Sequence, residues 1–171
     1  MIDELISKEE IHSKVKEIAQ QVSRDYKDKD LLILGVLNGA FLFCADLVRQ
    51  IEMAHTIDFI SVSSYGDETI SSGTVTIEHK PKKPIEDKDV LLVEDIIDTG
   101  NTVDYLIKTL SNMGARSIRV ASLLSKPSRR EVDVPIHYKG FDIEDLFVIG
   151  YGMDMAGSYR GLPYIGVYKD D

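Results

Sequence analysis

Residues 90–102 have the sequence VLLVEDIIDTGNT, in which an apolar run is followed by acidic residues and then by a glycine. The apolar run over 90–93 is short and uninterrupted, which is typical of a strand buried on both faces of a parallel sheet. Apolar residues at helical spacing follow from Thr102 onward, and Gly114 is placed to cap that helix. The stretch therefore predicts a strand, a loop and a helix, the repeating unit of an α/β protein.

The same alternation of strand and helix continues on both sides of this stretch. Ser7 and Glu10 have the spacing of a capping box, Ile6 and Ile11 that of a hydrophobic staple, and a helix is expected after them. The other expected elements are a helix over 40–51 and strands over 31–37, 56–65, 74–78 and 118–124. Beyond Pro127 the pattern changes to short β segments, expected over 134–138, 146–151 and 164–168. We therefore expect an α/β fold in which helices flank a parallel sheet, with a small β-containing hood from the C-terminal segment.

The length and composition are those of one globular domain. The chain has 171 residues, of which 43% are hydrophobic and 29% are charged, and no linker is long enough to divide it. We therefore expect a single domain over 1–171. Its core and ligand loops are expected over about 37–126, and the hood over about 127–171.

Charge and cysteine content narrow the classes of function. The formal net charge is -9, which disfavours nucleic acid as a partner. No apolar run has the length of a membrane span, and the acidic N-terminus is unlike a secretory signal. Cys44 is the single cysteine, so it cannot form a disulfide within the chain. A cytoplasmic protein without a membrane partner is expected.

The loop within residues 90–102 carries groups suited to a phosphorylated substrate. Ligands of an open parallel sheet bind beyond the carboxyl ends of its strands, and the apolar run delivers Glu94 and Asp95 to that edge. Gly100 permits a tight turn, and the amides that begin the next helix suit a phosphate. Carboxylates beside a phosphate need another role, such as binding sugar hydroxyls and Mg²⁺ or accepting a proton. Taken alone, Glu94-Asp95 is more often a solvated acidic turn, whereas the complete pattern is far more specific.

This pattern resembles the phosphoribosyl-pyrophosphate motif of the type I phosphoribosyltransferases, and it is closer to their hypoxanthine-guanine branch than to the orotate or adenine branches. The resemblance implies a type I phosphoribosyltransferase core. It also implies that the phosphoribosyl group is bound by Glu94, Asp95, Ile96, Ile97, Asp98, Thr99, Gly100, Asn101 and Thr102. Within this set, it implies that Glu94 and Asp95 bind the ribose hydroxyls, directly and through Mg²⁺, and that Asp98 lies near purine N7 as a general base. The family often has lysine at the position of Asn101, so one cation of the family pattern is absent.

The segment Leu37-Asn38-Gly39-Ala40 matches the family's pyrophosphate loop, in which a non-proline cis peptide presents an amide to the ligand. The family frequently has a basic residue at the position of Asn38, so a backbone contact alone is implied there. Arg160 matches the arginine that neutralises pyrophosphate, and Asp154 matches an acid near a second Mg²⁺. Without the resemblance, Asn38-Gly39 would be interpreted as an ordinary turn.

Further positions match the residues with which the family binds its purine. Lys126 matches the lysine that donates to the oxygen at purine C6, which favours 6-oxopurines over adenine. Phe147 and Val148 match the segment that stacks on the base and reads its edge, and Asp154 is expected to bind the purine together with them. The hood is therefore expected to bind the purine. Taken alone, Lys126 would face solvent and Phe147 would be a core residue of a strand.

Ser64 and Tyr65 precede a polar stretch over 66–73 that matches the family's mobile loop. In the family, that loop closes over the reacting centre and excludes water. An ordinary hairpin loop would have the same composition, so the sequence leaves both interpretations open.

The resemblance as a whole implies a purine-salvage enzyme that uses Mg²⁺ and transfers a phosphoribosyl group from phosphoribosyl pyrophosphate to a 6-oxopurine base. It also implies a homodimer or homotetramer. Two alternatives stay open: a non-catalytic, nucleotide-sensing regulator on the same fold, and a xanthine-preferring transferase. The sequence has no dinucleotide fingerprint, P-loop or nucleophile elbow. Arg129 and Arg130 indicate only a local surface feature.

Overall fold

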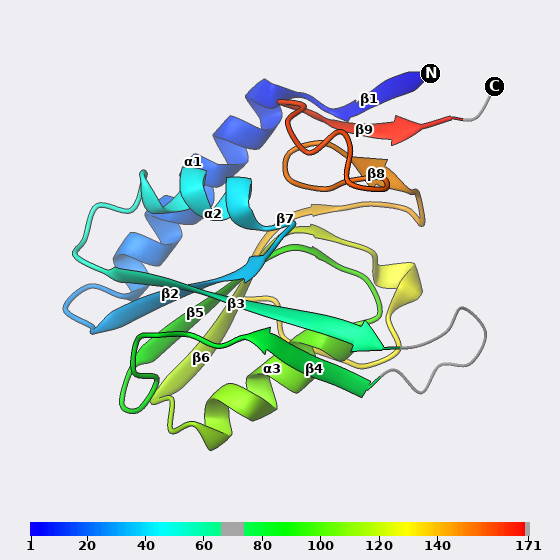
Figure 1. The fold of residues 1–171 in the computed structure, drawn as a ribbon. Coiled ribbons are helices and arrows are strands. Elements are labelled where there is room, and N and C mark those ends of the chain that lie inside the picture. Colours follow the sequence, from blue (N-terminus) through cyan, green and yellow to red (C-terminus); the bar gives the residue numbers. More distant parts are fainter. Residues whose placement is uncertain (66–73, 170–171) are drawn as a thin grey trace.

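The computed structural model describes residues 1–65 and 74–169, and within these ranges six strands form a central sheet in the order β4-β3-β2-β5-β6-β7 (Figure 1). The strands are β2 (Leu31–Leu37), β3 (Thr56–Tyr65), β4 (Thr74–His79), β5 (Asp89–Ile97), β6 (Ser117–Ser125) and β7 (Tyr138–Asp142). All neighbours pair in parallel except β3 and β4, which are antiparallel. The expected α/β fold with a parallel-dominated sheet is confirmed.

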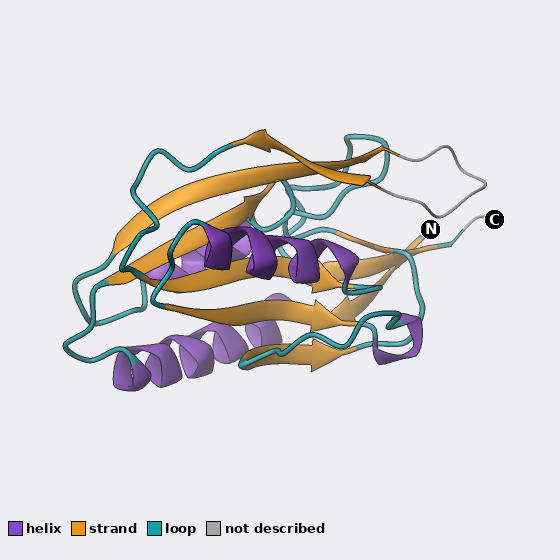
Figure 2. Cartoon of the chain, turned by 90° about the horizontal axis from the view of Figure 1, so that it is seen from below, coloured by secondary structure: helices purple, strands orange, loops and turns teal. Residues whose placement is uncertain are grey.

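Helices cover both faces of this sheet (Figures 1 and 2). The helices are α1 (Lys8–Asp25), α2 (Phe41–Val48) and α3 (Asn101–Asn112), with a short 3-10 turn, η1 (Pro127–Arg129). Side chains of a strand alternate between the two faces, so Ile33 packs with the residues of α1 and α2 while Leu34 packs with those of α3. This division explains why β2 and residues 90–93 of β5 are continuous apolar runs rather than alternating ones.

A second, three-stranded sheet joins the two ends of the chain (Figure 1). Its order is β1 (Ile2–Ile6), β9 (Ile165–Tyr168) and β8 (Val148–Ile149), and both pairings are antiparallel. The strand β1 was not predicted from the sequence. It is short, carries Asp3 and Glu4, and pairs with a partner at the far end of the chain, so no local signal marks it.

The strand expected over 134–138 was wrong, since β7 begins where that segment ends. Pro135 has no amide hydrogen to donate to a ladder, which explains why the strand starts after it. β7 then pairs in parallel with β6, so the central sheet continues past Pro127. The helix expected over 40–51 ends earlier, at Val48.

The strand expected over 90–93 extends to Ile97, and its two edges differ. Pairing with β2 stops at Val93, whereas pairing with β6 continues through Glu94 and Ile96 to Ile97. The backbone beyond Val93 therefore stays anchored on one side and is open on the other. The acidic residues belong to a strand end rather than to a free loop.

Both predicted helix caps are present. At the start of α1, the amide of Glu10 donates to Ser7 Oγ at 3.2 Å, and the amide of Ser7 donates to Glu10 Oε2 at 2.8 Å. After α3, Gly114 has a φ of 87°. Within the described ranges, no helix is both long and apolar enough to cross a bilayer.

Replacing Ser7 by alanine is expected to lower the free energy of unfolding by about 1 kcal/mol, because the substitution removes the cap for the Glu10 amide. Urea denaturation of both proteins measures the difference. Ser13→Ala, at an exposed position within α1, is the matched control and is expected to cost less, since alanine favours a helix interior. Equal losses for both variants would contradict the capping role of Ser7.

Candidate active site

Two neighbouring pockets open near the carboxyl ends of the parallel strands. The main pocket, of about 470 Å³, is lined by Leu37, Asn38, Gly39, Ser61, Val62, Glu78, Asp95, Ile96, Asp98, Lys126, Phe147, Val148, Met153, Asp154 and Arg160. The loop pocket, of about 210 Å³, is lined by Val36, Glu94, Ile96, Ile97, Asp98, Thr99, Gly100, Thr102 and Val103. Ile96 and Asp98 line both pockets, so one aspartate stands where the two meet. A third cavity, of about 530 Å³ beside α1 and α2, contains none of the predicted site residues.

The loop pocket is formed where β5 passes into α3. Gly100 is the N-cap of α3 and has a φ of 91°, a left-handed conformation that favours glycine. The carbonyl of Thr99 accepts hydrogen bonds from the amides of Glu131 and Val132 at 2.9 and 3.0 Å, which braces the loop from the segment after β6. The start of a helix provides amides and a positive dipole end, so this pocket can bind a phosphate.

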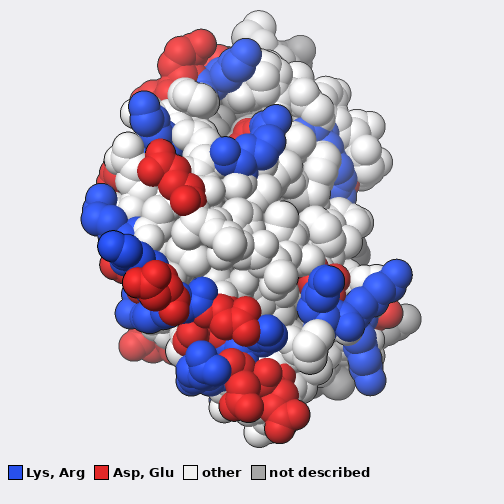
Figure 3. All heavy atoms as spheres, turned by 90° about the vertical axis from the view of Figure 1, so that its left-hand side faces the viewer, with Lys and Arg blue, Asp and Glu red and all other residues white. Residues whose placement is uncertain are grey.

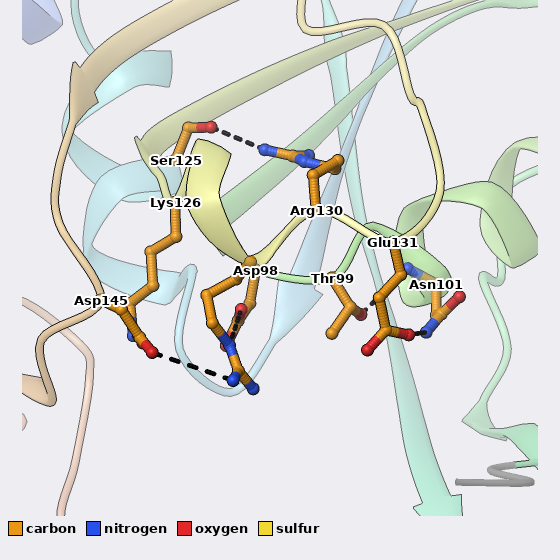
Figure 4. A network of polar contacts seen from close by, with 9 residues as sticks. Asp98, Thr99, Asn101, Ser125, Lys126, Arg130, Glu131 and Asp145 are labelled. Atoms are coloured by element: carbon orange, nitrogen blue, oxygen red, sulfur yellow. Dashed lines mark hydrogen bonds and ion pairs between the residues drawn. The ribbon is translucent and has the colours of Figure 1, made fainter.

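Asn101 differs from the other predicted residues of this loop because it is absent from the described lining of either pocket. Its side-chain amide donates to Glu131 Oε2 at 3.1 Å, and its backbone amide donates to Thr99 Oγ1 at 3.3 Å (Figure 4). The side chain therefore links the loop to the segment after β6.

The acidic pair is held in a poorly hydrated place. Glu94 lines the loop pocket and Asp95 the main pocket. Burial raises the pKa of Glu94 well above its usual value, and the nearby charge of Asp95 adds to the increase. Burial also raises the pKa of Asp95, against the opposing effects of the Ile96 amide and the Arg160 charge. A bound cation or sugar hydroxyls would relieve this crowding of negative charge.

The predicted pyrophosphate loop lies against Asp95. The non-proline cis peptide bond joins Leu37 to Asn38. A Cβ atom at Gly39 would lie 1.8 Å from Asp95 Oδ2, so glycine alone allows this approach. A Cβ atom at Gly152 would lie 2.1 Å from the carbonyl oxygen of Gly39, so the loop after β8 also packs on this turn.

Arg160 and Asp154 form an ion pair in the lining of the same pocket. Arg160 Nη2 lies 2.9 Å from Asp154 Oδ1, and Asp154 Oδ2 accepts from the Gly157 amide at 2.7 Å. Arg160 Nη1 also donates to the carbonyl oxygen of Gly152. The arginine is therefore held at the wall of the main pocket, where it can meet an anionic group.

The lining of the main pocket also includes an ammonium group and an aromatic ring. Lys126 is buried, and its Nζ lies 3.4 Å from Asp145 Oδ1. Phe147 is 58% exposed although it is a large apolar residue, so it is not the core residue that its strand pattern suggested. Val148 beside it is buried. An exposed ring at a pocket wall can stack on a planar ligand.

Arg129 is exposed and Arg130 is half-buried, and both also form contacts beside the candidate site. Arg129 Nε donates to Asp98 Oδ1 at 3.2 Å, and Arg130 Nη2 donates to Ser125 Oγ at 2.7 Å. The 3-10 turn η1 carries Arg129 back over Asp98. No local sequence signal marks this placement, because Arg129 lies 31 residues from Asp98 along the chain.

The structure describes only the approach to the expected mobile loop. Ser64 and Tyr65 end β3, and their backbones pair with Val75 and Thr74 of β4. The polar stretch over 66–73 lies outside the described residues.

Comparisons with known proteins show which family the chain resembles over most of its length. A model of the phosphoribosyl transferase domain matches residues 1–156. The chain belongs to the phosphoribosyltransferase family. It is similar to the hypoxanthine-guanine phosphoribosyltransferase of Bacillus subtilis, with 47% identity over 165 residues that cover 96% of this chain and 92% of that protein. It is also similar to the hypoxanthine phosphoribosyltransferase of Escherichia coli, with 44% identity over 167 residues that cover 96% and 94%.

Among solved structures, a hypoxanthine phosphoribosyltransferase from Staphylococcus aureus superposes with a TM-score of 0.94 at 41% identity, over 98% of this chain and 91% of that chain. The match spans the central sheet, both helical layers and the terminal sheet. In this phosphoribosyltransferase, the two pockets and the aspartate that lines both lie near the carboxyl ends of the parallel strands.

Proposed function

We propose that the protein is a purine-salvage enzyme that transfers the 5-phosphoribosyl group of phosphoribosyl pyrophosphate to N9 of hypoxanthine or guanine. The products are IMP or GMP and pyrophosphate. The observation that carries the proposal is that Asp98 lines both pockets, with a phosphate-binding helix start on one side and Lys126 on the other. Relatives named for this activity cover nearly the whole chain.

The donor would span both pockets. The 5′-phosphate would bind in the loop pocket, against Thr99, Gly100 and Thr102. The ribose hydroxyls would bind Glu94 and Asp95. The pyrophosphate would bind the backbone of Asn38-Gly39 and the guanidinium of Arg160, which stabilises the charge that develops on the leaving group.

The donor set fits Mg²⁺. Mg²⁺ is usually held by one or two carboxylates together with substrate phosphates and waters, rather than by a cage of protein ligands. The crowded pair Glu94 and Asp95 provides such carboxylates, and Asp154 would be the acid nearest a second ion. Over the described part of the chain, no group of three or more His, Cys, Asp or Glu residues could by itself hold a metal, which agrees with an ion shared with the substrate. When bound, Mg²⁺ would offset the charge of the pyrophosphate and orient it.

The acceptor would occupy the main pocket. Lys126 would donate a hydrogen bond to the oxygen at purine C6, Phe147 would stack on the ring, and Val148 would read its edge through the backbone. As the bond from N9 to the ribose carbon forms, the bond from that carbon to pyrophosphate breaks. Asp98 would accept the proton that the purine loses from N7.

A non-catalytic regulator that binds nucleic acid is not favoured. Such a protein needs a basic face, whereas the formal net charge is -9. On the face shown in Figure 3, lysine and arginine side chains are interspersed with acidic ones around a broad uncharged area. A xanthine-preferring transferase would use the same Lys126 contact and is distinguished by the assay below.

We also propose that the enzyme is a homodimer or homotetramer and acts in the cytoplasm. The family resemblance supports the assembly, and closed symmetric oligomers are the usual form of soluble oligomeric enzymes. Sedimentation equilibrium is expected to give a mass of two or four chains, and a monomer at micromolar concentration would contradict the proposed assembly.

A substrate panel tests the proposed function. Purified protein with phosphoribosyl pyrophosphate and Mg²⁺ is expected to form nucleotide from hypoxanthine or guanine and essentially none from adenine, whose amino group does not accept from an ammonium. Product formation is followed by chromatography, with ribose 5-phosphate replacing the donor as one control and a chelator replacing Mg²⁺ as another. No nucleotide from hypoxanthine, guanine or xanthine would refute the proposal. A kcat/KM for xanthine above those for hypoxanthine and guanine would show that the protein is a xanthine-preferring transferase instead.

A further inference from the structure

A continuous ion-pair network connects the two polar groups that face the proposed purine. We call it the Arg129 network, and its members are Asp98, Arg129, Asp145 and Lys126. Arg129 Nε lies 3.2 Å from Asp98 Oδ1, and Arg129 Nη1 lies 3.8 Å from Asp145 Oδ2. The other oxygen of Asp145, Oδ1, lies 3.4 Å from Lys126 Nζ. Asp98, Lys126 and Asp145 converge from three different segments of the chain (Figure 4).

The backbone fixes where the network forms. Lys126 follows the last residue of β6, and the turn η1 begins directly after it. The amide of Arg129 donates to the carbonyl oxygen of Lys126 at 3.1 Å, and the arginine side chain reaches Asp98 from this turn. Asp145 comes from the segment between β7 and β8, two residues before Phe147. Arg129 and Asp145 are absent from the described linings of the two pockets, so they act on the site through Asp98 and Lys126.

The N7–O6 edge of a 6-oxopurine matches the two groups that the Arg129 network connects. Atoms N7 and O6 lie side by side on one edge of the ring. A free base that carries its proton on N7 presents a donor beside an acceptor on that edge. Asp98 is a hydrogen-bond acceptor and Lys126 is a donor, so together they complement the edge if their spacing is kept. Two flexible side chains keep a spacing only when other contacts restrain them.

We propose that Arg129 and Asp145 are positioning residues that hold Asp98 and Lys126 at the spacing of the N7–O6 edge of a 6-oxopurine. Arg129 restrains Asp98 through Oδ1 and leaves Oδ2 for the purine. Asp145 divides its two oxygens between Arg129 and Lys126, so a shift at one end of the network reaches the other. This inference rests on the proposed function, because it needs a purine between Asp98 and Lys126. It adds that purine binding depends on residues outside the pocket.

The test compares the two substrates of one enzyme. Arg129→Gln is expected to raise the KM for hypoxanthine about three- to tenfold, the range expected when partly exposed ion pairs are lost, and to leave the KM for phosphoribosyl pyrophosphate within about twofold. Arg129→Lys keeps one ion pair but cannot bridge two carboxylates. Its KM for hypoxanthine is therefore expected to lie between those of Arg129→Gln and the wild type. Asp145→Asn is expected to raise the KM for hypoxanthine as well. In the double variant Arg129→Gln/Asp145→Asn, the fold increase in that KM is expected to be smaller than the product of the two single increases, because both substitutions disrupt the same network.

A purine analogue tests the proposed contact between Asp98 and purine N7 separately from the contact of Lys126. In 7-deazahypoxanthine a carbon replaces N7, so the base has no N7 proton to give to Asp98. The wild-type enzyme is expected to prefer hypoxanthine over this analogue as judged by the ratio of its inhibition constant to the KM for hypoxanthine. Arg129→Gln is expected to lower this ratio by about threefold or more. A general loss of protein stability would leave the ratio unchanged.

Lys108→Gln is the matched control, since it breaks the exposed Lys108–Asp104 ion pair on α3 without touching the network. It is expected to leave both KM values unchanged. An unchanged hypoxanthine KM in Arg129→Gln, a parallel rise for both substrates, or an increase in kcat/KM would overturn the inference, the last because Arg129 would then obstruct the site. The proposed proton transfer fails separately, if Asp98→Asn keeps its kcat while Arg129→Gln still weakens purine binding through Lys126.

Discussion

Replacing Asp98 by asparagine is expected to lower kcat by about 10- to 1,000-fold, the range that a general base contributes. Asparagine keeps the shape of the side chain, and its oxygen can still accept from Arg129 Nε as Asp98 Oδ1 does at 3.2 Å. It cannot accept the proton that the purine loses, because a neutral amide is a far weaker base. The effect is therefore expected in kcat, with the KM for phosphoribosyl pyrophosphate within about twofold of the wild-type value.

Steady-state kinetics with both substrates varied measures this change. Asp30→Asn is a suitable control because Asp30 also forms an ion pair, with Lys88, but lies far from the site. Asp30 directly precedes β2, at the end of the sheet opposite Asp98. That variant is expected to keep the wild-type kcat. A kcat for Asp98→Asn equal to that of the control would show that another group takes the proton.

Gly39→Ala is expected to reduce kcat/KM for phosphoribosyl pyrophosphate by about 100-fold, the cost of displacing site groups by about one ångström. The new Cβ atom would lie 1.8 Å from Asp95 Oδ2 and 2.7 Å from its Cγ, so either the carboxylate or the loop must move. Asp95 is hydrogen-bonded to the Ile96 amide at 2.8 Å, which limits how far it can turn. Movement of the carboxylate or of the loop would displace the groups proposed to bind the ribose from those proposed to bind the pyrophosphate.

Gly161→Ala is the matched control, since a Cβ atom there meets no other atom within 4 Å. It is expected to keep kcat/KM within about twofold. Thermal denaturation distinguishes a local displacement from unfolding, because the Gly39 variant is expected to lose activity while most of its protein is still folded at the assay temperature. Full activity in Gly39→Ala would contradict the close packing of this loop on Asp95.

The sequence predicted the elements whose signals are local. The strands β2 and β3 lie over 31–37 and 56–65 as expected. The signal of β2 is a continuous apolar run suited to a buried strand. The start of α1 was predicted equally well, because Ser7 and Glu10 form the capping box within four consecutive residues. Such features need no knowledge of distant partners.

Elements that depend on distant partners were missed or misplaced. The strand β1 exists because β9 pairs with it across almost the whole chain, and its own five residues carry little strand character. The strand β7 was placed too early because Val134, Ile136 and Tyr138 alternate like a strand, whereas Pro135 interrupts the ladder and Val134 packs with the residues of α3. Tertiary packing decides such cases.

The candidate site divides in the same way. The residues of the motif around Asp98 are consecutive, so their joint placement at one strand end could be expected from the sequence. Arg129 could not be placed, because it lies 31 residues from Asp98 and reaches it only through the short turn η1. Asp145, which completes the network, comes from a third segment.

The pairing of β1 with β9 has a consequence for synthesis on the ribosome. Chains emerge from the N-terminus, so β1 appears first and its partner appears after every other strand. The strand β8 has only two residues and is paired to β9, so it gains its place late as well. A nascent chain therefore completes the region proposed for the sugar phosphate well before Phe147 and Val148 can be fixed beside it. We expect the unfinished protein to have the loop proposed for the 5′-phosphate while it still lacks both Arg160, proposed to bind the pyrophosphate, and a settled place for the acceptor.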